Sequence, residues 1–222
     1  MGKSRTGARS GTLRLLPRED LLRTGDLDHA HWNYRRVLGP IQRTRFALAV
    51  SLLPATPVPR LLEIGYGSGV FLPALARHGQ ELFGIDIHAR HDEVTAILRR
   101  HGVPVVLHRA AAESIPFGDR SMDAVVAVSA LEFVQDLDCV CREVRRVLRS
   151  GGVFVAVTPG RSAWLDLGLR VLTGRSARRD FGSRREGLIA TLERHFCVDA
   201  RAGFPRFGRG PLRVYDALRL VP

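Results

Sequence analysis

The chain of 222 residues contains a single lysine, Lys3, although lysine and arginine together number 34. Nearly every basic residue is therefore arginine. Because the chain is also rich in alanine, glycine and valine, this bias indicates a GC-rich coding sequence as much as an acidic partner. The formal net charge is +12. Since arginine binds phosphate with two parallel hydrogen bonds, a nucleic-acid partner stays an alternative that composition alone does not favour.

Long apolar runs are also missing. No stretch approaches the roughly 20 apolar residues that a helix needs to cross a bilayer, and the beginning of the chain shows no apolar segment of the secretory kind. The three cysteines are Cys139, Cys141 and Cys197. An odd number without a secretory signal predicts reduced thiols in the cytoplasm. Cys139 and Cys141 would face different ways on a helix, so we expect no metal site there.

The most informative stretch is residues 60–72, which read RLLEIGYGSGVFL. An apolar run is followed by Gly65, Gly67 and Gly69 and then by an apolar helical pattern over residues 70–76. This order predicts a strand, a tight turn and a helix, because glycine permits positive φ and lets a ligand approach the backbone. The unpaired N–H groups at the start of the helix would point towards that ligand.

Two common nucleotide-binding motifs do not fit this stretch. A dinucleotide fingerprint needs a third glycine at position 70, where the chain has Val70. A phosphate-binding P-loop needs lysine followed by serine or threonine, and no lysine follows these glycines. An NAD-dependent dehydrogenase is therefore disfavoured.

An acidic residue, Glu63, stands near the end of the predicted strand, two residues before the G-x-G-x-G run begins at Gly65. This combination resembles the first motif of the class I S-adenosylmethionine-dependent methyltransferases, and the resemblance covers residues 58–160 well. It implies an α/β fold with a doubly wound, mostly parallel seven-stranded sheet, an antiparallel C-terminal hairpin strand and an N-terminal helical extension. It also implies S-adenosylmethionine as the methyl donor, with Glu63 holding the ammonium group of the donor through the glycine loop.

A second buried-strand pattern, residues 82–87, ends with an acid. Asp86 lies 21 residues after Gly65, about the distance at which a ribose-binding carboxylate falls. Since a carboxylate can accept from both ribose hydroxyls, Asp86 is the predicted ribose ligand. In relatives an Asp that binds the adenine amino group usually stands at the position of Ala111. Because of this departure, the apolar face of Ile87 and the backbone groups of Ala112 and Glu113 are left to hold the adenine ring.

The predicted cofactor-binding residues are Glu63, Gly65, Tyr66, Gly67, Gly69, Asp86, Ile87, Ala112, Glu113 and Ser129. Ser129 is included because the loop after the predicted strand 123–129 should border a cleft at the carboxyl ends of the strands. Many relatives carry a histidine where Glu132 stands. The candidate general bases are Glu132, His29, His31 and Tyr34. Glu132 is equally explained as an acid that stabilises the start of the next helix, and no metal ligands are predicted.

The remaining chain alternates short apolar runs with amphipathic patterns, which predicts parallel strands joined by right-handed crossovers. The predicted helices are residues 37–53, 93–100, 136–149 and 184–196. The predicted strands are residues 60–64, 82–87, 103–107, 123–129, 153–159, 197–204 and 211–221, with residues 150–152 ending the helix before the fifth strand.

Three regions make up the predicted domain organisation. Residues 1–18 are basic and without periodicity, which predicts a disordered tail. Residues 19–57 form the N-terminal helical extension, and residues 58–222 form the methyltransferase domain. Within it, residues 161–186 combine an apolar helical segment with an arginine cluster. We expect a lid or substrate segment there, with peripheral membrane contact or a phosphate-binding patch as alternatives.

Methyl transfer from a sulfonium needs mainly positioning and desolvation, with a base only where the acceptor must lose a proton. We therefore expect a cytoplasmic methyltransferase that acts on a small-molecule acceptor at oxygen, nitrogen or carbon. The net charge supports an RNA methyltransferase as an alternative, although no Asn-Pro-Pro-Tyr-like motif follows the fourth strand. Because Ala111 replaces the usual acid, a methyltransferase-like binding protein without activity is a second alternative. No sequence feature identifies the acceptor or the oligomeric state.

Overall fold

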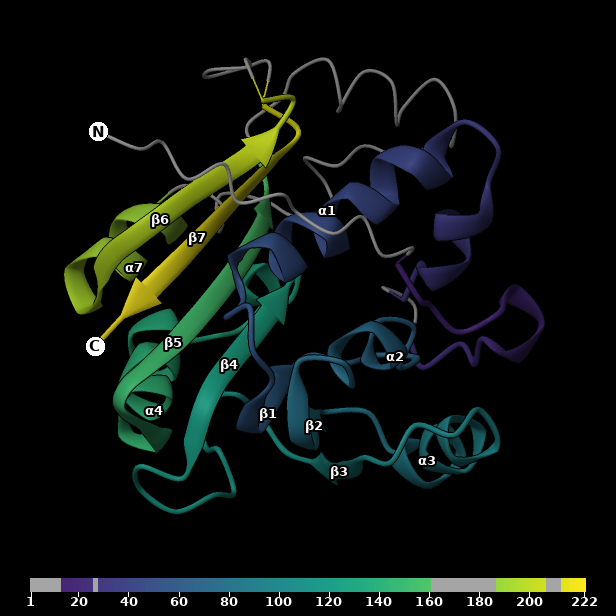
Figure 1. Cartoon of the computed structure of the whole chain (residues 1–222), viewed down its shortest axis with the longest axis horizontal. Helices are drawn as coiled ribbons and strands as arrows, with labels where there is room; N and C mark the ends of the chain where they lie inside the picture. Colours follow the sequence, from purple (N-terminus) through teal and green to yellow (C-terminus); the bar gives the residue numbers. More distant parts are fainter. Residues whose placement is uncertain (1–12, 26–27, 161–186, 207–212) are drawn as a thin grey trace.

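The computed structural model describes residues 13–25, 28–160, 187–206 and 213–222. Seven strands form one sheet in the order β3-β2-β1-β4-β5-β7-β6 (Figure 1). Neighbouring strands run parallel except at β7, which pairs antiparallel with both β5 and β6. This arrangement confirms the predicted doubly wound, mostly parallel sheet with its antiparallel C-terminal strand.

The strands of the sheet are β1 (Val58–Ile64), β2 (Gly79–Asp86), β3 (Val106–Arg109), β4 (Met122–Val128), β5 (Leu148–Pro159), β6 (Cys197–Phe204) and β7 (Tyr215–Val221). The helices are α1 (Leu38–Leu52), α2 (Leu72–Leu75), α3 (His91–Arg100), α4 (Leu137–Val147) and α7 (Leu188–His195), with the 3-10 turns η1 (Arg18–Asp20), η2 (Ala30–Tyr34) and η3 (Leu131–Phe133). None of the helices in the described ranges is both long and apolar enough to span a membrane.

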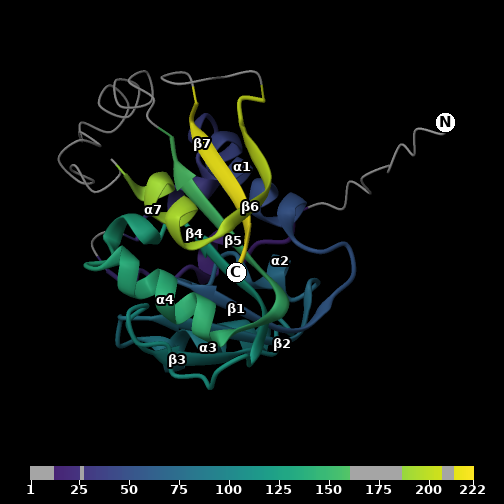
Figure 2. The ribbon, with the colours of Figure 1, turned by 90° about the vertical axis from the view of Figure 1, so that its left-hand side faces the viewer.

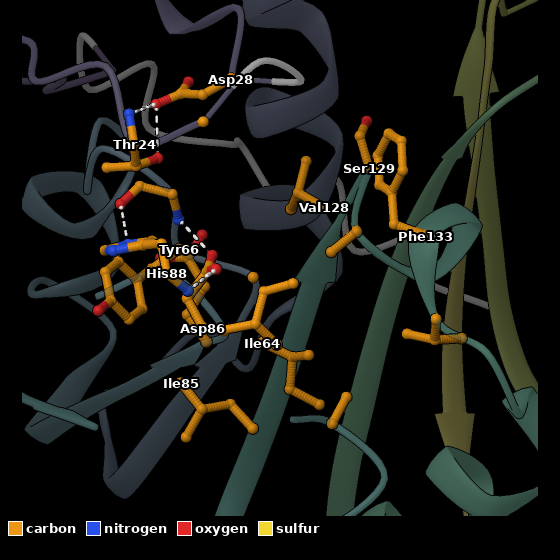
Figure 3. Close-up of a pocket in the computed structure, with 18 of the residues that line it drawn as sticks. Thr24, Asp28, Ile64, Tyr66, Ile85, Asp86, His88, Val128, Ser129 and Phe133 are labelled. Carbon is orange, nitrogen blue, oxygen red and sulfur yellow. Dashed lines mark hydrogen bonds between the residues drawn. The ribbon is translucent and has the colours of Figure 1, made fainter. Parts of the chain in front are cut away.

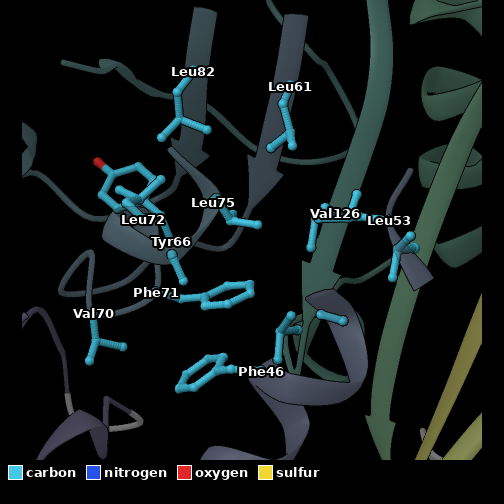
Figure 4. Close-up of a cluster of buried hydrophobic side chains, with 14 of the residues drawn as sticks. Phe46, Leu53, Leu61, Tyr66, Val70, Phe71, Leu72, Leu75, Leu82 and Val126 are labelled. Carbon is cyan, nitrogen blue, oxygen red and sulfur yellow. The ribbon is translucent and has the colours of Figure 1, made fainter. Parts of the chain in front are cut away.

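Two clusters of buried side chains join these layers. The first packs α1, α2 and α3 against one face of the sheet, and in it the rings of Phe46 and Phe71 stack with centroids 4.5 Å apart (Figure 4). The second packs α4 and α7 against the other face, where these two helices lie together (Figure 2). Helices on both faces explain why the buried parts of β4 and β5, AVVAV and VFVAV, read as continuous apolar runs.

The helices predicted over residues 37–53, 93–100 and 136–149 are confirmed within two residues at each end as α1, α3 and α4. The side chain of Asp136 caps α4 by accepting a hydrogen bond of 2.8 Å from the N–H of Cys139. The predicted lid or substrate segment, residues 161–186, lies outside the described residues.

The predicted disordered tail is wrong for residues 13–18. Leu16 is fully buried, and its N–H donates to the carbonyl oxygen of Val70 at 3.2 Å. Further along, Nε2 of His101 lies 2.8 Å from Oδ2 of Asp20 and so ties this segment to the end of α3. The basic composition of the segment hid the short leucine run that makes it part of the core.

The helix predicted over residues 70–76 is a single turn, α2. Pro73 stands in its first turn, and the chain leaves the helix at Ala76 in time for β2 to begin at Gly79. One turn is too short to align many peptide dipoles. The N–H groups of Gly69, Leu72 and Ala74 also donate to carbonyl oxygens within residues 66–71. These three groups are therefore not free to bind a ligand, contrary to the expectation.

Two strand boundaries also differ from the predictions. The third strand, predicted over residues 103–107, forms later as β3, because Pro104 has no N–H to give to a strand ladder. Residues 150–152, predicted to end a helix, lie inside β5. The first residue of that strand, Leu148, pairs with Met122, and the register then shifts before Ala124, as in a bulge.

Candidate functional site

A cleft of about 1020 Å³ lies at the carboxyl ends of β1, β2 and β4. Its walls are the glycine turn after β1, the turn after β2 and the loops after β3 and β4, together with α1. The N-terminal segment contributes Thr24, Gly25, Asp28, His29, Ala30 and Trp32. Figure 3 shows Asp86 and His88 on one side and Ser129 and Phe133 on the other. The predicted cofactor residues that line the cleft are Glu63, Gly65, Tyr66, Gly67, Asp86, Ile87, Ala112, Glu113 and Ser129.

The three glycines of the turn have positive φ, at 75° for Gly65, 52° for Gly67 and 73° for Gly69. Gly65 and Gly67 line the cleft, but Gly69 does not. A β-carbon on Gly69 would lie 2.9 Å from Cγ1 of Val94, so this glycine lets α3 pack against the turn. The structure therefore shows a packing role for Gly69, and its role in binding the cofactor stays a prediction.

Asp86 at the end of β2 contacts the glycine turn directly. Its Oδ2 accepts from the N–H of Gly67 at 2.9 Å, and its Oδ1 accepts from the N–H of His88 at 3.3 Å. An ionised carboxylate offers about four acceptor positions. Asp86 can therefore hold the turn and still accept from two hydroxyl groups in the cleft.

Glu63 is 3% exposed, and its Oε2 has no hydrogen-bond partner among the described residues. Burial raises the pKa of Glu63 to about 8, and the negative charge of Asp86 adds to the rise while Arg45 opposes it. A buried carboxyl oxygen without a partner fits a ligand that brings its own donor. A cation beside Glu63 would favour the ionised form.

Arg45 is a cleft residue that the sequence did not single out. It extends from α1, its Nε is buried without a partner in the described part of the chain, and its guanidinium carbon lies 4.7 Å from the ring centroid of Phe46. No spacing or motif distinguishes it from the many other arginines. Together, Arg45 and Glu63 place one cation and one carboxyl group along the same cleft.

Of the four candidate bases, His29 lines the cleft, with its ring stacked on Trp32 at a centroid distance of 4.4 Å. Glu132 is buried outside the lining, and its Oε1 accepts from Oγ1 of Thr158 at 2.8 Å. The structure therefore does not support Glu132 as a base that touches a ligand, because packing has turned it towards β5.

His31 and Tyr34 lie on η2 outside the cleft lining. His31 is exposed, and its partial desolvation and the charge of Arg35 lower its pKa. The hydroxyl of Tyr34 donates to the carbonyl oxygen of Leu16, and burial raises its pKa. Tyr34 thus anchors the N-terminal segment, and the structure supports neither residue as a base.

The end of the cleft that is predicted to bind adenine is mostly apolar. Ala111 lines it, and Ile87 presents a side chain that is 71% exposed. The carboxylate of Glu113 is already engaged, because its Oε1 accepts from the N–H of Gln135 at 2.8 Å. A flat ring placed here would meet Ile87 and backbone groups, and the adenine site stays a prediction.

The opposite end of the cleft combines aromatic rings with hydroxyl and amide groups. Phe133 and Ser129 lie there, opposite Asp86 (Figure 3). Trp32 and Tyr215 line the cleft as well, and the hydroxyl of Tyr215 donates to Oε1 of Gln42 at 3.2 Å. Ser129 adopts a positive φ of 52°, and its buried Oγ has no partner within the described ranges. A backbone strained in this way is common at functional sites.

Residues 62–156 match the family model described as a methyltransferase domain. The match confirms the resemblance to the class I S-adenosylmethionine-dependent methyltransferases that the glycine motif indicated. These residues include the glycine turn, Asp86 and the strands β2 to β4. The similarity to a methyltransferase domain thus covers residues 62–156, which are less than half of the chain.

Two relatives illustrate the range of similar sequences. An uncharacterised protein of Mycobacterium tuberculosis, Rv2003c, is 35% identical over 143 residues, which cover 64% of this chain and 47% of that protein. A ubiquinone biosynthesis O-methyltransferase of Mesorhizobium japonicum is 29% identical over 104 residues, 46% of this chain and 42% of that enzyme. The matched part of the chain thus spans less than half the length of either relative.

Among solved structures, the N-methyltransferase NodS of Bradyrhizobium japonicum in complex with S-adenosylhomocysteine is similar, with a TM-score of 0.62. The likeness covers 87% of this chain and 92% of NodS at 19% sequence identity. At this identity the comparison shows a shared fold.

Proposed function

We propose that the protein is an S-adenosylmethionine-dependent methyltransferase that acts on a small-molecule acceptor. The observation that carries the proposal is the pair of buried polar groups in one cleft, Oε2 of Glu63 and Nε of Arg45, neither with a partner among the residues described. The amino-acid part of the donor carries one ammonium and one carboxylate group. Glu63 and Arg45 offer the complementary charges.

The other cleft residues complete the proposed donor site. Asp86 would accept from the ribose hydroxyls with the acceptor positions that Gly67 and His88 leave free. Ile87 and the backbone of the loop after β3 would hold the adenine ring. The donor supplies a methyl group that its sulfonium has already activated, so these residues contribute orientation and exclusion of water.

The proposed acceptor site is the side of the cleft opposite Asp86, where Phe133 and Ser129 lie (Figure 3). The aromatic rings that line the cleft favour a molecule with an apolar body, and Oγ of Ser129 offers it a hydrogen bond. His29 is the predicted base that lines the cleft, and it would take a proton from an acceptor that must lose one. The ubiquinone biosynthesis enzyme among the relatives supports a small-molecule acceptor.

The described surface gives less support to an RNA acceptor than the net charge suggests. Many arginines are already paired with acids, namely Arg60 with Glu81, Arg90 with Glu93, Arg146 with Asp119 and Glu143, Arg149 with Asp123, and Arg219 with Asp199. Paired arginines contribute less to phosphate binding than free ones. The three cysteines are free, and the cytoplasm stays the predicted location.

The first experiment is calorimetric titration of S-adenosylmethionine and S-adenosylhomocysteine into the wild type and Asp86→Ala. Loss of a charge-assisted contact should weaken binding by about tenfold or more. Transfer of a labelled methyl group to a panel of phenols, amines and quinols then identifies the acceptor class. The absence of binding by the wild type would overturn the proposal. Binding without turnover on any acceptor would favour the inactive binding protein that Ala111 suggested.

A further inference from the structure

The peptide groups on both sides of Gly67 are held by side chains from the turn after β2. Oδ2 of Asp86 accepts from the N–H of Gly67 at 2.9 Å, while Nε2 of His88 lies 3.0 Å from the carbonyl oxygen of Gly67 (Figure 3). The two contacts lie on either side of one α-carbon. They therefore restrict both backbone dihedrals of a glycine whose own conformational freedom is large.

The tautomer of His88 follows from its second ring nitrogen. The N–H of Arg90 donates to Nδ1 of His88 at 3.1 Å, so Nδ1 must act as an acceptor. In a neutral imidazole the proton then resides on Nε2, which donates to the carbonyl oxygen of Gly67. His88 therefore acts as a donor towards the glycine turn and an acceptor towards its own turn.

Arg90 extends this network to the N-terminal segment. Its Nη1 donates to the carbonyl oxygen of Arg23 at 2.8 Å, and its Nε donates to Oε1 of Glu93 at 2.7 Å. The ring of Tyr66 meets that of His88 edge to face with centroids 5.0 Å apart. His88 is thus fixed from several directions, as a side chain that positions another group must be.

We propose that His88 is a positioning residue for the methyl donor. Its hydrogen bond holds Gly67 at a φ of 52°. This conformation keeps the backbone of the glycine turn, beside Asp86 and Glu63, in the conformation that binds the donor. This inference rests on the proposed function. No group of His88 needs to react, because its effect passes through the Gly67 carbonyl.

Two substitutions separate the two hydrogen bonds of His88. The amide nitrogen of Gln reaches about as far as Nε2 of histidine, so His88→Gln retains a donor for the Gly67 carbonyl and loses the acceptor for Arg90. The shorter His88→Asn retains an acceptor near the position of Nδ1 and loses the donor to Gly67. Each variant removes the imidazole, and each loses one of the two contacts.

The experiment measures the dissociation constant of S-adenosylhomocysteine by calorimetry and the melting temperature without ligand, for the wild type and both variants. We expect His88→Gln to bind within about threefold of the wild type and His88→Asn to bind about tenfold more weakly. Amide hydrogen exchange at residues 65–69 should increase in His88→Asn alone.

Three other results would overturn the inference. Equal affinity in all three proteins would show that the contact to Gly67 does not matter for the donor. Losses of affinity that follow the losses of melting temperature in both variants would indicate a structural role only. If His88→Asn does not fold, a tenfold loss in a folded His88→Gln still contradicts the proposal. A wild type that binds no S-adenosylhomocysteine would instead overturn the proposed function on which it rests.

Discussion

A β-carbon on Gly65 would lie 2.4 Å from the β-carbon of Ala130. The turn after β1 and the segment after β4 therefore approach each other more closely than any side chain on residue 65 allows. The φ of Gly65 is also positive, at 75°. Glycine is required here for two independent reasons, and the contact fixes the wall of the cleft between the proposed donor and acceptor ends.

Gly65→Ala should destabilise the protein by about 1–3 kcal/mol and weaken donor binding, because the added methyl group must displace Ala130. Chemical denaturation and calorimetry with S-adenosylhomocysteine measure the two effects. Gly102→Ala is the matched control, since Gly102 has a φ of 67° but no atom within 4 Å of its β-carbon position. Equal losses in the two variants would show that backbone strain alone, and not the contact with Ala130, decides the cost.

Glu63 should make donor binding depend on pH. Burial raises the pKa of this carboxyl to about 8, and an ammonium group in the cleft favours the ionised form, so binding should release a proton. The affinity of the wild type should then rise with pH by up to about tenfold per unit and level off above pH 8. Glu63→Gln should lack this rise. A wild-type affinity that is flat between pH 6 and about pH 8 would contradict the assignment.

The raised pKa of Glu63 should also make the stability of the folded protein fall as the pH rises. The pKa of Glu63 in the folded protein lies above its ordinary value of 4.5, so folding retains a proton that the unfolded chain loses. The contribution of this proton to the free energy of unfolding is fully present below pH 4.5 and is lost as the pH rises towards 8. Denaturation without ligand should show the wild type losing stability relative to Glu63→Gln across this range. A constant difference between the two proteins would contradict the raised pKa.

The parts of the site that lie on a motif could be predicted from the sequence. Glu63 and Asp86 each close a buried strand, and the parallel sheet brings such ends together. Arg45 could not be predicted in this way, because only the packing of α1 across the sheet brings it to the cleft. Glu132 shows the converse, since its loop borders the cleft while its side chain turns inward towards Thr158.

Arg45→Gln should weaken binding of S-adenosylhomocysteine by about tenfold, because the carboxylate of the ligand would lose its cation. The decarboxylated analogue of S-adenosylhomocysteine should bind the wild type and this variant equally. Arg43→Gln is the control, because it removes the same charge from α1 at a residue outside the cleft lining, whose Nη1 donates to the carbonyl oxygen of Asn33. If Arg45→Gln weakens both ligands to the same extent, Arg45 does not bind the carboxylate.

Leu16 tests whether the N-terminal segment belongs to the fold. Its side chain is fully buried and its N–H donates to Val70, three residues beyond Gly67 in the turn that lines the cleft. Leu16→Ala should cost about 2–5 kcal/mol, and in a chain of this size each kcal/mol lowers the melting temperature by roughly 2–4 °C. Leu15→Ala, at a partly exposed neighbour, should cost less. Because Val70, to which Leu16 donates, lines the cleft, Leu16→Ala should also weaken donor binding. An unchanged melting temperature would return residues 13–18 to the disordered tail that composition predicts.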